Sequence, residues 1–262
     1  MLVEIVKVPG SHKSWRREIY DYFNENVFFE MSSEYAQRWT TIMRMFMVND
    51  KDRAADFISR ISAATSSILR SSMDQDRLFH VRRLAFIIIS GDLDQFVTHI
   101  SAIKEKLAEL GRTASIDPIH GEVCLLFRAL LLRFSPVHLI SFWPMMITEI
   151  QSLFTQVLEQ SSIVSKEQLP LLFEACKLLD MLLVVNSEDF QLYSPVKFLT
   201  NFLRQEWVFI TDTIEAVYRS PNSQTYALID RLALRLGGVT PTGSRNNSFS
   251  GDDLFSKVIS VV

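Results

Sequence analysis

The sequence predicts an all-α protein, an irregular helical solenoid of the HEAT or armadillo kind with roughly 8–11 helices. Apolar residues recur at spacings of three and four, no segment alternates like a strand over a useful length, and the 262 residues include only 8 glycines and 8 prolines. Hydrophobic residues make up 48% of the chain, enough for a sizeable core. We expect one all-helical domain over 1–236, a flexible Gly/Ser/Thr/Asn-rich linker over 237–251, and a short tail helix or disordered segment over 252–262.

The first 13 residues are mixed in character and end in Pro9-Gly10, so we expect a lead-in without a helix. The next three helices each show an apolar stripe, and Ser32 or Ser33 is suited to start the second of them. They are expected over about 14–24 (Trp15, Ile19, Tyr22 or Phe23), from Ser32 or Ser33 through Phe46 (Tyr35, Trp39, Ile42, Met43), and over 51–70 (Phe57, Ile58, Ile61, Ala64, Ile68).

Two further helices are expected next. Asp74 opens one that Gly91 stops, because glycine commonly ends helices. Asp92 is then expected to restart the chain at once, as a helix that runs to Leu110. One face of this helix is apolar and charged residues lie off that face, as an outer helix requires. The apolar face consists of Leu93, Phe96, Ile100, Ile103, Leu107 and Leu110.

From Asp117 onward the helices are apolar almost all round, which is typical of helices buried between neighbours. Asp117-Pro118 starts one that ends near Phe134. Ser135-Pro136 follows as a cap and first-turn proline, and Pro144 marks a break or kink because proline removes a helical hydrogen bond. Further helices are expected over 144–159, over 166–185 with Ser165 as cap and Gln168 three residues on, and near 195–208, 211–219 and 222–236.

Charge and cysteine content exclude several protein classes. The net charge is −3, and residues 1–110 carry 15 basic and 15 acidic side chains, so a broad basic face for nucleic acid is not expected. Any anion site must be a local patch. Glu4 and Lys7 interrupt a possible signal peptide, and the uncharged run 134–148 is too short to span a membrane. We therefore expect a soluble protein of a reducing compartment, with Cys124 and Cys176 as buried free thiols.

No motif in the chain indicates catalysis, a metal or a cofactor. The five histidines are scattered, without cysteine or carboxylate at metal-ligand spacing. There is no G-x-S-x-G elbow, and the glycine-rich stretch 237–244 lacks the Gly-Lys-Ser/Thr ending of a phosphate loop. The sequence therefore predicts a protein that is not an enzyme, with no catalytic residue, no metal site and no cofactor.

The basic residues offer the one candidate binding site. Arginine on an apolar helix needs a partner, since an unpaired buried charge is costly. Arg128 and Arg133 therefore either pair with carboxylates of neighbouring helices or line an anion pocket that grips lipid phosphates. A lipid site should bring at least three of the arginines together on one exposed surface. The candidate headgroup-binding residues are Lys13, Arg16, Arg17, Arg82, Arg83, Arg128 and Arg133.

Several blocks of the chain stand out, in order, between about Ser14 and about Phe198. The strongest is LFRALLLRFSP-x-HL-x-S-x-WP-MMITE at 126–149. The others are SWR at 14–16, RRLAF at 82–86 with Asp94-Gln95 after it, and a block at 175–193 with Ala175-Cys176-Lys177, Leu179-Asp180, Ser187-Glu188 and Phe190-Gln191-x-Tyr193. Together these blocks resemble the C-terminal region of the Dopey family. The chain departs from the family in a short connection at 160–165 and in its tail after about residue 200.

The resemblance implies a helical adaptor region of a long peripheral membrane protein of endosome-to-Golgi traffic and Golgi organisation. It implies residence on the cytoplasmic face of Golgi and endosomal membranes and in the cytosol. It implies as partners a large scaffold related to Arf exchange factors, a lipid flippase, kinesin and phosphatidylinositol 4-phosphate. The alternative hypothesis is a structural homodimerisation module, pairing through an exposed leucine-rich face near 166–185 or through the tail at 252–262.

Overall fold

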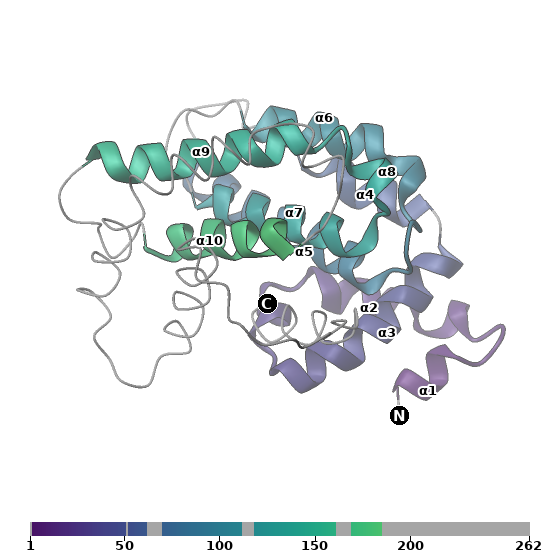
Figure 1. The fold of residues 1–262 in the computed structure, drawn as a ribbon. Helices are drawn as coiled ribbons and strands as arrows, with labels where there is room; N and C mark the ends of the chain where they lie inside the picture. Colours follow the sequence, from purple (N-terminus) through teal and green to yellow (C-terminus); the bar gives the residue numbers. More distant parts are fainter. Residues whose placement is uncertain (1, 51, 62–69, 112–117, 161–168, 185–262) are drawn as a thin grey trace, which may run out of the picture. The chain divides into compact units, whose positions relative to one another are not determined.

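The computed structural model describes residues 2–50, 52–61, 70–111, 118–160 and 169–184. Within these ranges the chain forms helices and turns without any strand, which confirms the predicted all-α class (Figure 1). Whether the helices form a solenoid stays a prediction. The elements are α1 (Leu2–Val6), α2 (His12–Asn24), the 3-10 helix η1 (Asn26–Glu30), α3 (Ser33–Asn49), α4 (Asp52–Ser59), α5 (Arg70–Ser90), the 3-10 helix η2 (Val97–His99), α6 (Ile100–Leu110), α7 (Ile119–Arg133), α8 (Pro136–Leu139), α9 (Trp143–Gln160) and α10 (Leu169–Val184).

The described helices belong to two compact units, with α1 to α8 in the first and α9 and α10, which pack on each other, in the second. The boundary lies between Phe142 and Trp143. The single domain over 1–236 therefore stays a prediction. The expected helices after residue 185, the linker, the tail and the caps at Asp117 and Ser165 lie outside the described residues.

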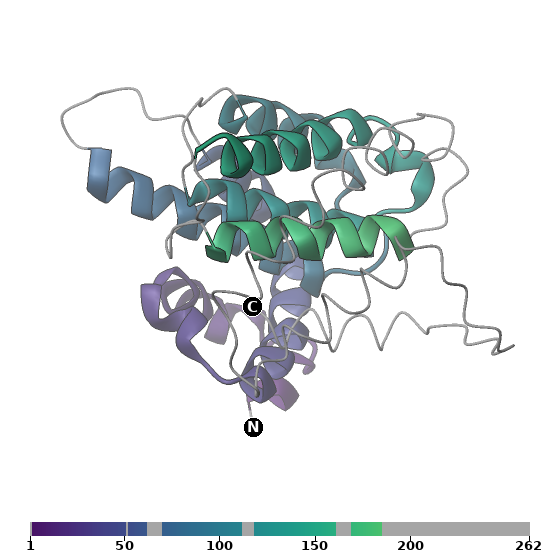
Figure 2. The same ribbon diagram turned by 60° about the vertical axis from the view of Figure 1, so that its left-hand side comes forward.

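The first unit is built around α5 and α7, which lie side by side in Figures 1 and 2. Helix α7 and the C-terminal part of α5 are apolar on most sides, and long runs of each are buried, from Val123 to Leu131 and from Leu84 to Ile89. The prediction that the helix after Asp117 is buried almost all round is confirmed. Helices α3 and α4 pack against α5, and α1 packs against α3.

Phenylalanine rings join the N-terminal helices to α5. Phe23 of α2 lies edge-on to Phe28 of η1, with ring centroids 4.8 Å apart, and to Phe57 of α4 at 5.4 Å. Phe28 also lies 5.4 Å from Phe86 of α5. Edge-to-face rings at these distances attract each other beyond their burial. This cluster therefore locks α2, η1 and α4 onto the central helix.

The prediction that residues 1–13 lack a helix is wrong. Residues 2–6 form α1, and α2 begins at His12, two residues earlier than expected. A single turn is too short to be stable by itself. It forms because it packs on α3 and buries Val6, a tertiary contact that the pattern of residues 1–13 does not reveal.

The helix expected to restart at Asp92 begins only at Ile100, after turns and η2. Asp94 adopts a left-handed backbone (φ 59°), and its N–H donates to the carbonyl of Arg133 at 2.8 Å. Its carboxylate accepts the N–H of Ser135 at 2.8 Å, which lowers the pKa of Asp94. The end of α7 thus holds this segment in a turn. Gly91 is needed there, because a Cβ would lie 2.4 Å from the Phe96 ring.

Other predicted boundaries agree with the structure. Ser32 stands at the N-cap of α3 and Gly91 follows the end of α5. Pro136 opens α8 after Ser135, although the Ser135 side chain makes no capping hydrogen bond. Helix α9 begins beside Pro144, as the predicted break requires. The helix expected over 51–70 is shorter, because α4 ends at Ser59.

Both cysteines are buried thiols that form no disulfide, as predicted. Burial raises the pKa of Cys176 to about 12, because the thiolate would have to form away from water. At pH 8 this thiol stays protonated. We expect neither Cys124 nor Cys176 to react with an aromatic disulfide reagent in the native protein. Both should react at once in guanidinium chloride at about 6 M, a concentration that unfolds most proteins. Rapid native labelling of either thiol would contradict the burial.

Candidate functional site

Helix α2 presents three cations to solvent. Trp15, Ile19 and Phe23 recur every four residues and are buried, so they form the inner side of the helix. Lys13, Arg16 and Arg17 lie on the same stretch and are exposed. Residues three and four apart are neighbours on a helix surface, so these three charges are adjacent. We call them the basic face of α2.

A braced turn holds the N-terminal end of the basic face. The Ser11 hydroxyl lies 2.7 Å from the carbonyl oxygen of Val8 and 2.9 Å from that of Ile5. It also accepts the indole N–H of Trp15 at 2.9 Å. Gly10 supplies the positive φ of 79° that the turn requires, which glycine adopts without strain. The start of α2 is thereby fixed relative to α1.

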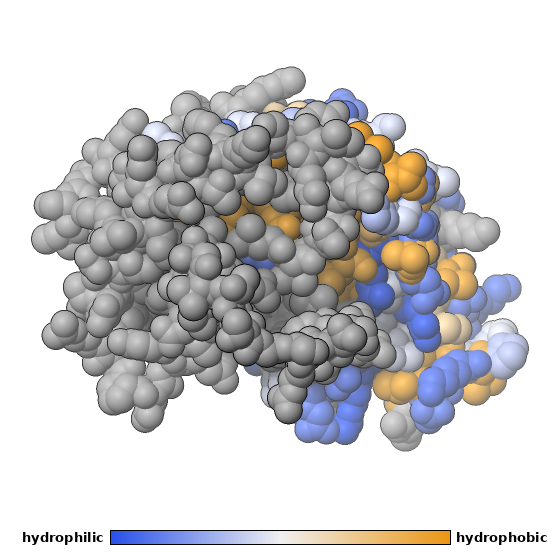
Figure 3. Space-filling model, in the orientation of Figure 1, coloured by the Kyte–Doolittle hydropathy of each residue, from blue (hydrophilic) through white to orange (hydrophobic). Residues whose placement is uncertain are grey.

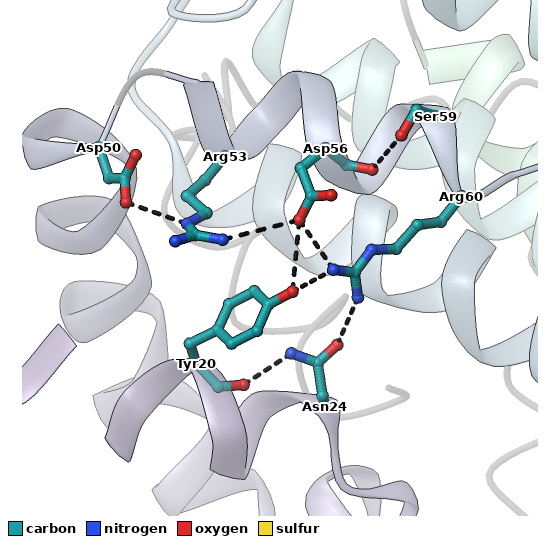
Figure 4. A network of polar contacts seen from close by, with 7 residues as sticks. All are labelled: Tyr20, Asn24, Asp50, Arg53, Asp56, Ser59 and Arg60. Atoms are coloured by element: carbon teal, nitrogen blue, oxygen red, sulfur yellow. Dashed lines mark hydrogen bonds and ion pairs between the residues drawn. The ribbon is translucent and has the colours of Figure 1, made fainter. Parts of the chain in front are cut away.

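A polar network holds the other end of α2 against α4 (Figure 4). The Arg60 guanidinium donates to Asn24 Oδ1 at 3.1 Å, to Asp56 Oδ2 at 2.9 Å and to the Tyr20 hydroxyl. Arg53 lies over the Tyr20 ring, 4.6 Å from its centroid. Its hydrogen bond with Asp50 raises the pKa of Arg53, so this cation stays charged. The network fixes the rotation of α2 and hence the outward direction of its basic face.

The basic face has few partners within the protein. Arg17 lies 3.7 Å from Asp21, an exposed pair of the kind that contributes little to stability. Lys13 and Arg16 make no ion pair with any described part of the chain. The first turn of α2 contains no acidic residue. Cations near a helix N-terminus are slightly unfavourable, so this charge does not serve the stability of α2.

Arg82 and Glu122 form an ion pair between α5 and α7. The Arg82 Nε donates to Glu122 Oε2 at 3.0 Å, and Nη2 donates to Oε1, so the contact is bidentate. Arg82 lies on the helix expected to end at Gly91, and Glu122 was not among the predicted partners. A fork of this kind is strong and geometrically specific. Arg82 therefore joins the two central helices.

Arg83 and Arg133 each bind the end of another helix. Arg83 is buried and donates from Nε to the Phe23 carbonyl at 3.0 Å and from Nη2 to that of Asn24 at 2.6 Å. Arg133 donates from Nε to the Ile89 carbonyl at 2.7 Å. Helix C-terminal carbonyls lack helical partners, and a cation there also meets the negative end of the helix dipole. The two hypotheses from the sequence paired Arg133 with a carboxylate or with a lipid phosphate, and neither included this contact with a backbone carbonyl.

The seven predicted residues do not converge on one surface. Arg128 is buried within α7. Arg128 and Arg133 lie on α7, and Arg82 and Arg83 lie on α5. The basic face, in contrast, lies on α2. The structure therefore brings together two arginines and a lysine, not three arginines. A headgroup-binding role for the seven residues stays a prediction, and the exposed part of the set is the basic face of α2.

Exposed apolar side chains accompany this basic face. Ile5 and Val8, whose carbonyls Ser11 contacts, are 38% and 56% exposed. In the space-filling view, apolar surface interrupts the hydrophilic surface at the lower right, where α1 lies in Figure 1 (Figure 3). Residues 5–17 contain four cations and no carboxylate. Apolar and cationic groups in one place are typical of proteins that touch an anionic bilayer.

The polar network was not predicted from the sequence, although one of its residue pairs follows a recognisable spacing. Asp56 and Arg60 are four residues apart with the acid first, the favourable order for a helix pair. Tyr20 and Asn24 gave no such signal, because their partners lie 36 and 40 residues away. The described residues contain no cluster suited to a metal ion. Nor does any described helix have the length and hydropathy needed to cross a membrane.

Comparison with known proteins gives a family match along most of the chain. The family described as "DOP1 C-terminal" matches residues 1–250. This range is wider than the 14–198 region of the expected resemblance and includes the tail after residue 200. No solved structure matches the chain.

The matching relatives are much longer proteins. Protein dop1 of Emericella nidulans is 31% identical over 256 residues, which cover 90% of this chain and 13% of that protein. Protein DOP1B of Xenopus laevis is 30% identical over 210 residues, covering 69% of this chain and 9% of that protein. Protein DOP1 of Saccharomyces cerevisiae is 25% identical over 246 residues, covering 88% and 14%. The chain thus spans a small fraction of each relative.

Proposed function

Because the chain belongs to the DOP1 C-terminal (Dopey) family, we propose that it is a non-enzymatic docking module within a much longer membrane-traffic protein. The match over residues 1–250 and the short share of each relative that it covers support this view. The described fold supports it as well, because packed helices whose ends are held by hydrogen bonds and ion pairs suit a scaffold. The module binds proteins and contacts an anionic membrane.

The membrane contact rests on one observation, the exposed basic face of α2. Lys13 and Arg16 have no ion pair in the described structure, and Arg17 has only a long one. Each basic residue close to an anionic surface contributes about 1 kcal/mol of attraction. Ile5 and Val8 add apolar contact beside these charges. Phosphoinositide headgroups, phosphatidylinositol 4-phosphate among them, are the proposed ligands.

The proposal for the whole protein follows the family. Its place is the cytoplasmic face of Golgi and endosomal membranes, where it acts in endosome-to-Golgi retrieval. Its partners are a large scaffold related to Arf exchange factors and a lipid flippase. The module itself would then be one of several contact sites along a long protein.

Charge reversal of the basic face tests the membrane contact. We expect Arg16→Glu/Arg17→Glu to weaken binding of the chain to liposomes containing phosphatidylinositol 4-phosphate by about 30-fold or more, since four unit charges change. Binding of the unaltered chain should fall as salt rises, because exposed charges are screened. The measurement is liposome co-sedimentation at low and near-physiological salt.

A charge-matched variant controls for net charge. Arg44→Glu/Lys104→Glu changes the same number of charges at exposed positions of α3 and α6, and it should leave binding nearly unchanged. Equal losses in both variants would show that only net charge matters. No binding of the unaltered chain to any anionic liposome would disprove the membrane contact and leave protein docking as the function.

The structure does not favour homodimerisation through α10. The leucines of that helix that were expected to form an exposed face, including Leu172, Leu178 and Leu179, are buried. The tail at 252–262 lies outside the described residues. Mass measurement across a concentration series tests self-association directly.

A further inference from the structure

A second exposed surface lies beyond the basic face, at the C-terminal end of α2. Tyr22, Val27 and Tyr35 are 40%, 52% and 56% exposed. The Tyr22 ring stacks on Trp39 of α3, with centroids 5.3 Å apart and planes 17° from parallel. Tyr35 is one helical turn before Trp39 on α3, so the two share a side of that helix. We call Tyr22, Tyr35 and the half-buried Trp39 the aromatic patch.

The aromatic patch rests on the phenylalanine cluster. Phe28 is buried, and its ring lies 5.1 Å from Trp39 and 5.8 Å from Tyr22, edge-on to both. The exposed rings are therefore fixed before any partner arrives. A rigid surface loses little conformational freedom on binding, and tyrosine and tryptophan are the residues that most often dominate binding energy at interfaces.

The sequence around Tyr22 is acidic between Arg17 and Arg38. Residues 18–37 contain five carboxylates and not one lysine or arginine. Asp21 and Glu34 pair with Arg17 and Arg38, while the three others have no ion pair with described residues. These five residues are Glu18, Asp21, Glu25, Glu30 and Glu34.

The protein itself shows how a cation sits on this surface. The guanidinium of Arg38 lies over the Tyr35 ring, 5.5 Å from its centroid, and donates to Glu34 Oε1 at 2.6 Å. A cation held by a ring face and a carboxylate together is a favourable arrangement. Glu25, which has no ion pair with described residues, follows Tyr22 by three residues, and its N–H donates to the Tyr22 carbonyl. A ring and a carboxylate for a cation from outside are thus close together in the chain.

We propose that the aromatic patch docks a basic protein segment, one that places lysine or arginine around an apolar or aromatic anchor. The anchor packs on Tyr22 and Trp39, and the basic residues meet Glu18, Glu25 and Glu30. An anionic membrane or a nucleic acid would be repelled by the same carboxylates. The proposal specifies the protein-docking part of the proposed function, and it is independent of the membrane contact on α2.

Selection from a random 16-residue displayed peptide library on the full chain tests this proposal. We expect the enriched peptides to be rich in lysine and arginine beside an aromatic or leucine residue. A synthetic, fluorescently labelled copy of the most enriched peptide then serves as the probe. In anisotropy titrations we expect Glu30→Lys/Tyr22→Ala to bind it at least tenfold more weakly than the unaltered chain (on the order of a hot-spot loss).

The matched control is Glu105→Lys/Val48→Ala, which changes one exposed carboxylate on α6 and one exposed apolar residue on α3 away from the patch. We expect less than about twofold loss for it, the scale of changes outside hot spots. Circular dichroism melts should show that both variants fold.

Three outcomes would overturn the proposal: no enriched peptide, an enriched pool without basic excess, or equal binding to both variants. A patch variant that loses liposome binding would assign the surface to the membrane and overturn it as well. The membrane contact is tested by liposome binding of the α2 charge-reversal variant, and the aromatic patch is tested by peptide binding. Failure of one proposal is therefore distinguishable from failure of the other.

Discussion

Replacing Arg83 by methionine is expected to lower the free energy of unfolding by about 3 kcal/mol, because charged hydrogen bonds to backbone carbonyls contribute roughly 1.5–3 kcal/mol each. The Arg83 side chain is 3% exposed and binds the carbonyls of Phe23 and Asn24 and the side chain of Asn26. Methionine fills similar volume without donors, so buried oxygens at the end of α2 lose their partners.

The environment of Arg83 offsets part of this cost, because burial and a neighbouring cation both disfavour its charge. Burial lowers the pKa of Arg83, and the nearby Arg60 acts in the same direction, while Asp76 opposes both. The cation persists because arginine remains charged under nearly all conditions in proteins. We expect Arg83→Lys to recover less than half of the loss, since an ammonium cannot reproduce the planar fork.

Urea denaturation followed by tryptophan fluorescence and circular dichroism measures this effect. Arg38→Met is the matched control, because Arg38 is exposed and makes only surface contacts. We expect it to change stability by no more than about 0.5 kcal/mol. A loss below about 1 kcal/mol for Arg83→Met would mean that the end of α2 is satisfied by other donors.

Replacing Phe28 by alanine is expected to cost about 3–5 kcal/mol, the usual range for a buried phenylalanine. Phe28 is fully buried and its ring meets those of Phe23, Phe86 and Trp39. The cavity would lie at the junction of η1, α3 and α5. Because Phe28 also supports Tyr22, the same variant should bind the selected basic peptide more weakly.

The neighbouring residue provides the control. Val27 is 52% exposed, so Val27→Ala removes little buried surface and should change stability by no more than about 0.5 kcal/mol. Denaturation of the two variants under identical conditions gives the comparison. Equal costs at positions 27 and 28 would contradict the description of Phe28 as the centre of the ring cluster.

The sequence was informative wherever local pattern decides structure. The four-residue spacing of Trp15, Ile19 and Phe23 predicts both α2 and the exposure of its basic face. Glycine and proline marked real boundaries at Gly91 and Pro136. The errors arise where tertiary contacts override pattern. Residues 92–99 keep helical periodicity, yet Asp94 is bound by the end of α7 and Phe96 packs against Gly91.

The binding site was less predictable than the fold. An arginine beside an apolar run has the same sequence pattern whether its side chain binds a phosphate or the carbonyls at the end of a helix. Arg83 finds its partner carbonyl 60 residues away, and Arg133 finds one 44 residues away. Only the folded chain brings those atoms together. The acidic run around Tyr22 was readable, but the exposure of its rings depends on how α2 and α3 pack.

Helix α2 has one more consequence, for how the molecule meets a surface. Its 13 residues span about 20 Å at 1.5 Å per residue. Its cations lie in the first half and Asp21 and Glu25 lie at the far end, so side-chain charge and backbone polarity point the same way. In the proposed membrane contact, a negatively charged bilayer would exert a torque on the unit that carries this helix. The cationic end would turn toward the headgroups, and Tyr22, at the other end of α2, would remain available to a second molecule.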